Sequence, residues 1–253
     1  MSMKMLLEQL KRDELVLWAG SGFSLYSGMP EVHAIKKALL QECSPEVQNE
    51  MKTITQLPDF CDKFIQMNSR DVLLHILSSM INKPPCSLKY HQLLTKIPQI
   101  RTIISTNYDL LFEKAYGDQI LSLIGHDFID QETKRVKLFK IHGDIRFPES
   151  IIITKSDYQT FLSKVYEPVW KELEKIVMKK SILFVGYSFS DLNIQFLLKK
   201  MNSKLGKVLK QSYLVSPQLP AQRIKVLQQK NIHFLQMKAE DLIQQLYREC
   251  GVK

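Results

Sequence analysis

The stretch that decides the fold is Leu15-Val16-Leu17-Trp18-Ala19-Gly20-Ser21-Gly22, an apolar run that ends in a glycine-rich turn. A second apolar run, Ile182–Val185, also ends at a glycine, Gly186. Continuous apolar runs of this kind are typical of strands buried in a parallel sheet. We therefore expect both segments to be strands that are followed directly by tight turns.

Further strand candidates alternate with helical segments along the chain. The strand candidates are Arg101–Thr106, Val136–Ile141, Ser212–Val215 and Ile232–Leu235, and the helical segments lie between Thr106 and Gly117, from Asp191 to Met201 and at about Ala239–Glu249. Strands that alternate with helices predict an α/β fold with a doubly wound, mostly parallel sheet.

Residues 31–99 break this alternation. Apolar residues recur at helical spacing in Ile35–Glu42, Asp59–Met67 and Asp71–Ile81, without a convincing strand between them. We expect a helical insertion over about residues 31–99, packed over the first βα turn. Because no Gly/Ser/Pro-rich linker divides the chain, we expect one domain over residues 1–253.

Composition excludes several classes of protein. The 253 residues are 45% hydrophobic and 24% charged, which is ordinary for a folded protein and argues against disorder. The longest apolar runs are far shorter than the ~20 residues that cross a bilayer. Charges at Lys11–Glu14 interrupt the region where a signal peptide needs an apolar run. We expect a cytoplasmic protein without membrane contact.

The cysteines argue against a metal or redox centre. Cys43, Cys61, Cys86 and Cys250 are widely separated and form no Cys-x-x-Cys pair. Zinc ribbons and thioredoxin-type sites require such pairs. We therefore expect reduced, mostly structural thiols and no metal site.

The net charge of +9 is concentrated near the C-terminus. Residues 196–253 contain eleven Lys or Arg and three acidic residues. A basic surface suits nucleic acid or an acidic partner, although solvated helix faces have the same composition. No aromatic residues interleave with the lysines as a single-strand binding surface requires.

Polar residues that can carry chemistry follow the predicted strands directly. They are Asn107, Asp109, His142 and Ser188. Ligands of open α/β sheets bind in the crevice outside the carboxyl ends of the strands, so these residues converge on one site. An asparagine offers a donor and an acceptor, an aspartate a negative charge, and a histidine can accept a proton near neutral pH. Taken singly, each also has a structural explanation as a helix cap or turn residue.

The glycine-rich turn suits phosphate binding but matches the dinucleotide fingerprint only in part. Gly20 and Gly22 allow backbone N–H groups to approach phosphate oxygens. The third glycine of that fingerprint is missing. A purely structural turn is the alternative.

Four motifs, in their order along the chain, resemble those of the sirtuin family, and most closely the bacterial sirtuin-like NAD hydrolases of anti-phage defence. The motifs are Gly20-Ser21-Gly22-Phe23-Ser24 with Ser27-Gly28-Met29-Pro30, Thr106-Asn107-Tyr108-Asp109, His142-Gly143-Asp144 and Gly186-Tyr187-Ser188-Phe189-Ser190-Asp191. Pro148–Tyr158 is similar to the segment that follows the His-Gly motif in that branch. The resemblance spans about residues 15–235.

The resemblance implies a Rossmann-like NAD site beneath a helical module. It implies that Asn107 and His142 are catalytic. The residues that it implies for cofactor binding are Gly20, Ser21, Gly22, Ser24, Asp109, Gly186 and Ser188.

Two departures from the sirtuin pattern weaken a protein deacylase interpretation. The four-cysteine zinc module of sirtuin deacylases is missing after the His-Gly motif, and Glu31-Val32-His33 replaces the usual Asp-Phe-Arg. The resemblance therefore implies hydrolysis of NAD to nicotinamide and ADP-ribose. The alternatives are a non-catalytic NAD- or ADP-ribose-binding regulatory subunit and, less favoured, an NAD-dependent deacylase.

An unrestrained NAD hydrolase would drain its own cell, so we expect gated activity. The 253 residues leave little room for a sensor domain. We therefore expect a protein partner or a homo-oligomer to control this defence effector. The basic C-terminal surface is a candidate contact for that partner or for nucleic acid.

Overall fold

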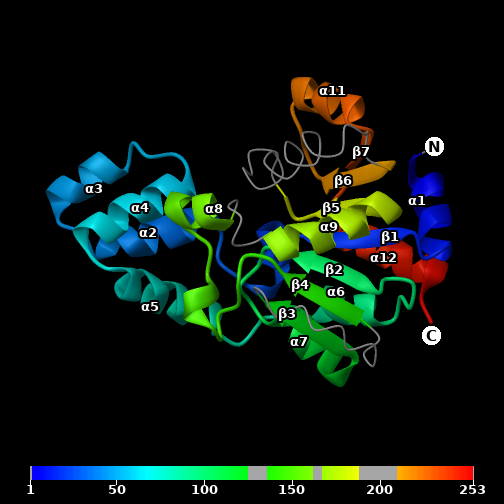
Figure 1. Ribbon diagram of the computed structural model, residues 1–253, viewed down its shortest axis with the longest axis horizontal. Helices are drawn as coiled ribbons and strands as arrows, with labels where there is room; N and C mark the ends of the chain where they lie inside the picture. Colours follow the sequence, from blue (N-terminus) through cyan, green and yellow to red (C-terminus); the bar gives the residue numbers. More distant parts are fainter. Residues whose placement is uncertain (1, 125–135, 162–166, 188–209, 253) are drawn as a thin grey trace.

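In the computed structural model, which describes residues 2–124, 136–161, 167–187 and 210–252, a seven-stranded sheet carries helices on both faces (Figure 1). Every strand pair is parallel, in the order β3-β4-β2-β1-β5-β6-β7. The strands are β1 (Leu15–Ala19), β2 (Thr102–Ser105), β3 (Ile120–Ile124), β4 (Val136–Lys140), β5 (Ser181–Val185), β6 (Ser212–Ser216) and β7 (Ile232–Gln236). The predicted doubly wound α/β sheet is confirmed.

The central strand β1 is the point where the chain changes direction across the sheet. From β1 the chain builds one half through β2, β3 and β4, and then crosses to build the other half through β5, β6 and β7. The turns after β1 and β5 therefore lie side by side at this switch point. Such switch points are where doubly wound sheets bind ligands.

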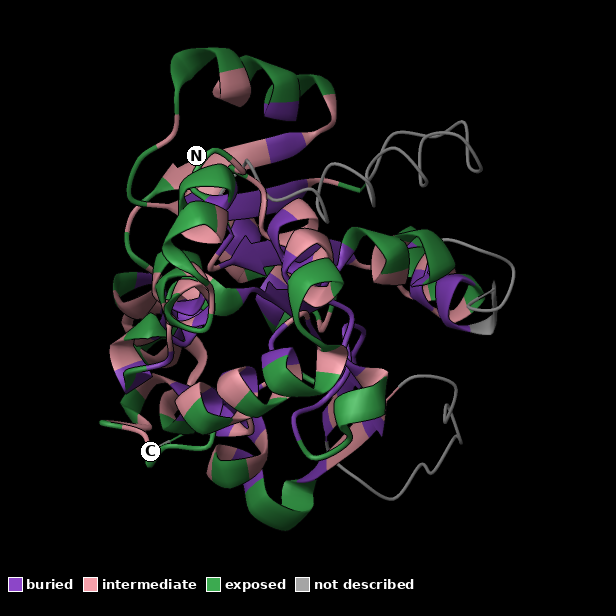
Figure 2. Ribbon diagram, turned by 90° about the vertical axis from the view of Figure 1, so that its left-hand side faces the viewer, coloured by how far each residue is buried: buried purple, intermediate pink, exposed green. Residues whose placement is uncertain are grey.

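Alternating side chains bury both faces of the sheet, because successive residues of a strand point to opposite faces. In β1, Leu15 and Leu17 pack into one core and Val16 and Trp18 into the other. The first core includes residues of α1 (Ser2–Lys11), α6 (Lys89–Thr95), α7 (Leu111–Tyr116) and α12 (Ala239–Cys250). The second includes residues of α8 (Lys155–Phe161), α9 (Glu167–Lys179) and α11 (Ala221–Gln229). Figure 2 shows buried strands in the interior and exposed residues on the outer faces of the helices.

A third core belongs to a helical lobe, which we define as α2 (Val32–Gln41), α3 (Pro45–Met51), α4 (Leu57–Met67) and α5 (Arg70–Ile81). Figure 1 shows the lobe beside the sheet, with α8 against it. The helices predicted at 35–42, 59–67 and 71–81 correspond to α2, α4 and α5, and the helical insertion after the first βα turn is confirmed. The last helix of this region, α6, packs instead with α7 and α12 against the sheet.

One strand, β3, was not predicted from the sequence. Edge strand β3 has the sequence Ile-Leu-Ser-Leu-Ile, and only Ile120 and Leu123 are buried in it. Only a 3₁₀ turn, Gly117–Gln119, separates it from α7, and its partly buried residues give no clear strand pattern. The helix predicted from Asp191 to Met201 lies outside the described residues. In the described part of the chain, no helix is long and apolar enough to cross a membrane.

The turns after β1 and β5 are in backbone contact, which glycines make possible. The N–H groups of Gly20 and Gly22 donate to the carbonyls of Val185 and Gly186, each over 2.9 Å. Gly186 has a φ of +76°, and a Cβ there would lie 2.2 Å from the nitrogen of Phe23. A side chain at Gly186 would therefore push the two turns apart.

We predict that Gly186→Ala destabilises the fold by about 3 kcal/mol or more, because overpacking adds to the cost of a left-handed alanine. Gly117→Ala is the matched control, since Gly117 also has a positive φ (+55°) but has open space around its Cβ position. The control should lose only the cost of its backbone conformation, about 1–3 kcal/mol, and less than Gly186→Ala. Urea unfolding measures both free energies, and equal losses would contradict the packing argument.

Candidate active site

A cavity of about 350 Å³ lies where the strand ends meet the helical lobe. Pockets for small molecules and cofactors typically fall between about 300 and 1,000 Å³. Its polar wall comes from the turns after β1, β2, β4 and β5 and includes Ser21, Ser24, Thr106, Asn107, Asp109, His142 and Gly186. Its apolar wall includes Met29, Pro30 and the lobe residues Val32, Ile35, Leu57, Pro58 and Ile81. Asn107 and His142, 35 positions apart in the sequence, thus line one cavity.

The side-chain amide of Asn107 is held in place through the hydrogen bonds that its NH₂ group donates. Its Nδ2 donates to the carbonyl of Gly20 (3.2 Å) and to Ser24 Oγ (2.9 Å). Because a carbonyl only accepts, the contact with Gly20 fixes which end of the amide is nitrogen. Asn107 Oδ1 is buried and accepts no hydrogen bond from the described residues. A buried acceptor without a partner, in a residue that lines a cavity, suits a water molecule or a ligand hydroxyl.

Asp109 anchors the other end of this chain of hydrogen bonds. Ser24 Oγ donates to Asp109 Oδ2 over 2.8 Å, and the N–H of Leu111 donates to Oδ1 over 3.0 Å. Burial raises the pKa of the Asp109 carboxyl, while the Leu111 hydrogen bond and the nearby Lys140 charge oppose that rise. The Ser24 hydroxyl, 1% exposed, is fully engaged by Asn107 and Asp109, so it orients them both.

His142 presents a neutral ring to the cavity. The side chain is buried, and burial lowers its pKa to about 3. Its ring meets those of Tyr158 and Phe161 edge to face, and Tyr158 Oη lies 3.5 Å from Nδ1. A neutral imidazole in this position can accept a proton.

The glycine-rich turn differs in detail from the expectation. The N–H groups of Gly20, Gly22, Phe23 and Ser24 all donate to backbone carbonyls of the protein, so they stabilise the turn itself. Ser21 is exposed and lines the cavity, which leaves it well placed for an anion. The implied cofactor roles of Gly20, Gly22 and Gly186 stay predictions, and Ser188 lies outside the described residues.

Two tyrosines of the cavity region were quoted in the motifs but given no role. Tyr187 Oη bonds Thr106 Oγ1 (2.8 Å) and donates to the carbonyl of Ala19 (3.1 Å), which ties the turn after β5 to β1 and β2. Tyr158 comes from α8. The sequence signal for Tyr187 was its place in a strand-end turn, and that for Tyr158 was the segment Pro148–Tyr158 after the His-Gly motif.

Helix α8 is tied to the lobe by charged residues. Arg70 Nη1 contacts both carboxylate oxygens of Asp157 at 3.0 Å, and Arg70 Nη2 donates to the carbonyl of Ile151. Asp62 accepts from the N–H of Lys155. These contacts hold Tyr158 beside His142.

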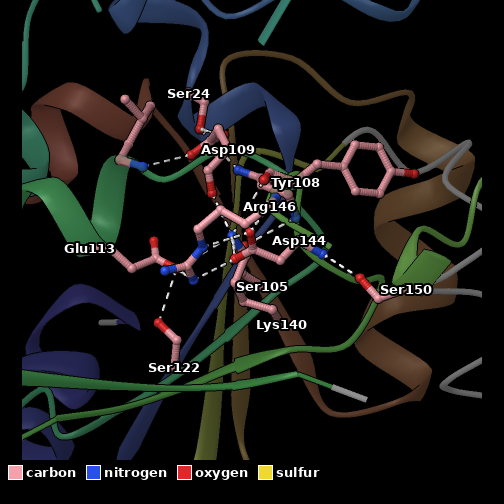
Figure 3. Close-up of polar contacts among 12 residues, drawn as sticks. Ser24, Ser105, Tyr108, Asp109, Glu113, Ser122, Lys140, Asp144, Arg146 and Ser150 are labelled. Carbon is pink, nitrogen blue, oxygen red and sulfur yellow. Dashed lines mark hydrogen bonds and ion pairs between the residues drawn. The ribbon is translucent and has the colours of Figure 1, made fainter. Parts of the chain in front are cut away.

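A cluster of charged residues lies next to the polar wall, with Lys140 and Asp144 buried and Arg146 exposed (Figure 3). Lys140 Nζ pairs with Asp144 Oδ2 over 2.6 Å, and Arg146 and Glu113 complete the cluster. Burial alone would raise the pKa of Asp144, but the hydrogen bonds from Arg146 and the charge of Lys140 hold it below its ordinary value. The sequence signal was a lysine in an apolar strand with an aspartate four positions later.

The other sequence predictions concern metal and basic surfaces. Among the described residues, no group of three or more His, Cys, Asp or Glu side chains could hold a metal ion. Of the basic clusters, Lys210, Arg223, Lys225 and Lys230 are described, whereas the lysines at 199–207 lie outside the described residues. The contacts proposed for this surface stay predictions.

Comparisons with curated proteins point to one group of relatives. The chain is 25% identical to the NAD(+) hydrolase ThsA of Bacillus cereus (strain MSX-D12) over 201 residues, which cover 78% of this chain and 41% of that protein. It is 28% identical to ThsA of Cytobacillus dafuensis over 214 residues, 81% of this chain and 41% of that protein. A shorter match, 28% over 102 residues, links it to defense-associated sirtuin 2 of Bacillus subtilis, over 38% of this chain and 10% of that protein. The chain thus spans about two fifths of the length of the ThsA proteins.

Solved structures share the fold at low sequence identity. One, from work on the mechanism and regulation of Sir2 enzymes, has a TM-score of 0.55 and 12% identity, over 98% of this chain and 96% of that chain. Another, from work on sirtuin substrate affinity, has a TM-score of 0.56 and 14% identity, over 99% and 100%. Residues 101–235, more than half of the chain, match the SIR2-like domain family. The chain therefore belongs to the SIR2-like family, as its four motifs predict.

Proposed function

We propose that this protein is an NAD+ glycohydrolase that cleaves the bond between nicotinamide and ribose. The observation that carries the proposal is the buried Asn107 Oδ1, which has no hydrogen-bond partner in the described part of the chain and shares its cavity with the neutral His142. Hydrolysis needs a water molecule that is held in place and a group that accepts its proton. Asn107 Oδ1 can hold the water, and His142 can accept the proton. The names of the ThsA relatives support NAD as the substrate.

The reaction breaks the N-glycosidic bond, and its electron pair returns to the nicotinamide ring. Positive charge develops on the anomeric carbon, and water adds there. Asn107 Oδ1 accepts a hydrogen bond from that water or from a ribose hydroxyl, and His142 accepts the proton that is released. The products are nicotinamide, ADP-ribose and a proton.

The polar and apolar walls of the cavity have separate roles in this proposal. Asp109 and Ser24 keep the Asn107 amide from rotating, because both of its N–H bonds are used. The apolar wall excludes bulk water, which strengthens the polar contacts inside. We assign the pyrophosphate to the neighbourhood of Ser21, the exposed residue of the glycine-rich turn.

Control of the activity is part of the proposal. A defence effector that consumes NAD has to stay inactive until it is triggered, and we assign the trigger to a protein partner or to self-assembly. Full activity of the isolated monomer, measured beside its mass in solution, would contradict this part and leave NAD hydrolysis intact.

We predict that purified protein, assayed alone and with extract of phage-infected cells, releases nicotinamide from NAD. His142→Ala should lower kcat by about 10²–10⁴-fold, the usual effect of losing general-base assistance, and Asn107→Ala by about 10²–10³-fold, the usual effect of losing one positioned hydrogen bond. Asn49→Ala and His33→Ala, at exposed positions of α3 and α2, are the matched controls and should retain activity. Liquid chromatography of nicotinamide and ADP-ribose measures both products.

The outcomes separate the alternatives. Unchanged turnover in both site variants would remove the proposed mechanism. Binding of ADP-ribose without nicotinamide release under either condition would indicate a binding subunit. Release that requires an acylated peptide would indicate a deacylase.

The pH profile tests the state of His142. Because burial lowers its pKa to about 3, the ring stays neutral as the pH falls from 7.5 to 5.5. We expect kcat/KM to fall less than about twofold over that range, whereas a solvated histidine with a pKa near 6.5 would cause about a tenfold loss at pH 5.5.

Two variants provide the controls for this profile. Tyr158→Phe keeps the ring covered and should leave the profile flat, and Tyr158→Ala admits water and should restore an acid limb near pH 6.5. An acid limb near pH 6.5 in the wild-type protein would contradict the buried, neutral state of His142.

A further inference from the structure

Lys140, the last residue of β4, is a buried cation outside the cavity. Its side chain is 1% exposed, and it does not line the cavity that holds Asn107 and His142. Its Nζ pairs with Asp144 Oδ2 over 2.6 Å and donates to the carbonyl of Asp109 over 2.6 Å, with the carbonyl of Tyr108 at 3.4 Å (Figure 3).

These contacts join the two turns that carry the site. Lys140 and Asp144 bracket the turn that holds His142. The carbonyl acceptors belong to the turn after β2, immediately after Asn107. The N–H of Ile145 adds a second link, to the carbonyl of Tyr108 over 3.1 Å. One ammonium group thus connects the segments on either side of the cavity floor.

Stability alone does not explain a buried lysine here. Removing two charges from water costs free energy, and apolar replacements of buried ion pairs are often neutral or stabilising. Asp144 also has a second cation, because Arg146 Nε and Nη2 lie 2.9 and 2.8 Å from its two oxygens. Among the described residues, what Lys140 adds is the donor for the carbonyl of Asp109, whereas the carbonyl of Tyr108 also accepts from the N–H of Ile145.

We propose that Lys140 is a positioning residue that sets the spacing between the Asn107 turn and the His142 turn. The proposal rests on the function proposed above. Because Asn107 and His142 act on the same reacting centre, the ribose and the attacking water, a small change in their spacing lowers the rate of the chemical step. Binding of the nucleotide depends on other parts of the cavity, so it changes little.

The test uses three variants of the full chain. Lys140→Met removes the donor at similar volume. The double variant Lys140→Met/Asp144→Asn also removes the carboxylate charge that would otherwise lose a partner. Arg146→Gln is the matched control, since it takes a cation from the same Asp144 without touching the turn after β2. Circular dichroism and thermal melting establish that each variant is folded.

Two readouts decide the proposal. Kinetics with NAD should show kcat at least tenfold lower for both Lys140 variants, with KM changed less than threefold, and Arg146→Gln within twofold of wild type. Hydrogen exchange should be at least tenfold faster for the backbone amides of residues 106–111 and 141–146 in the Lys140 variants than in the control.

Two results would contradict the role proposed for Lys140. Folded Lys140 variants whose exchange or kcat equals that of Arg146→Gln would overturn the proposal. Loss of the fold in the double variant would also overturn it, because Lys140 would then act in stability. If the wild-type protein releases no nicotinamide, the proposed function fails, while hydrogen exchange still decides whether Lys140 joins the turns.

Discussion

The hydrogen bonds from the Asn107 amide to Gly20 and Ser24 join the turn after β1 to the turn after β2. Both hydrogens of the amide are used in these bonds, and the Ser24 hydroxyl in turn donates to Asp109. The amide is therefore fixed with its oxygen as the remaining polar atom. The role that we assign to Asn107 in holding the water or the ribose depends on that orientation.

The strand order explains why such distant residues reach one another. In a parallel sheet the carboxyl ends of the strands lie on the same edge, and here β1, β2, β4 and β5 are neighbours. The glycines in the turns after β1 and β5 allow these two turns to pack in direct contact at that edge. The lobe then covers it with apolar side chains, and α8, which is tied to the lobe through Arg70 and Asp157, places Tyr158 over His142.

Much of this arrangement could be predicted from the sequence, for identifiable reasons. The apolar runs at β1 and β5 are buried at every position, so their strand pattern was unambiguous. The convergence of Asn107, Asp109 and His142 followed from parallel strand ends. Strand β3 could not be predicted, because a half-buried edge strand carries a weak pattern and only a short 3₁₀ turn separates it from α7.

The contacts inside the site could not be predicted from the sequence. That the N–H groups of Gly20 and Gly22 bond to the chain itself depends on the approach of Gly186, which lies 166 and 164 positions further along the sequence. The link from Lys140 to the carbonyl of Asp109 likewise joins backbone atoms to a distant side chain. Contacts to the main chain leave little trace in residue type, so only coordinates reveal them.

A crystal structure of the His142→Ala variant with bound NAD tests the central claim most directly. The account predicts that the nicotinamide ribose lies in this cavity and that Asn107 Oδ1 is within about 3.2 Å of a ribose hydroxyl or of a water beside the anomeric carbon. The dinucleotide bound elsewhere, or an Asn107 oxygen turned away from the ribose, would contradict it.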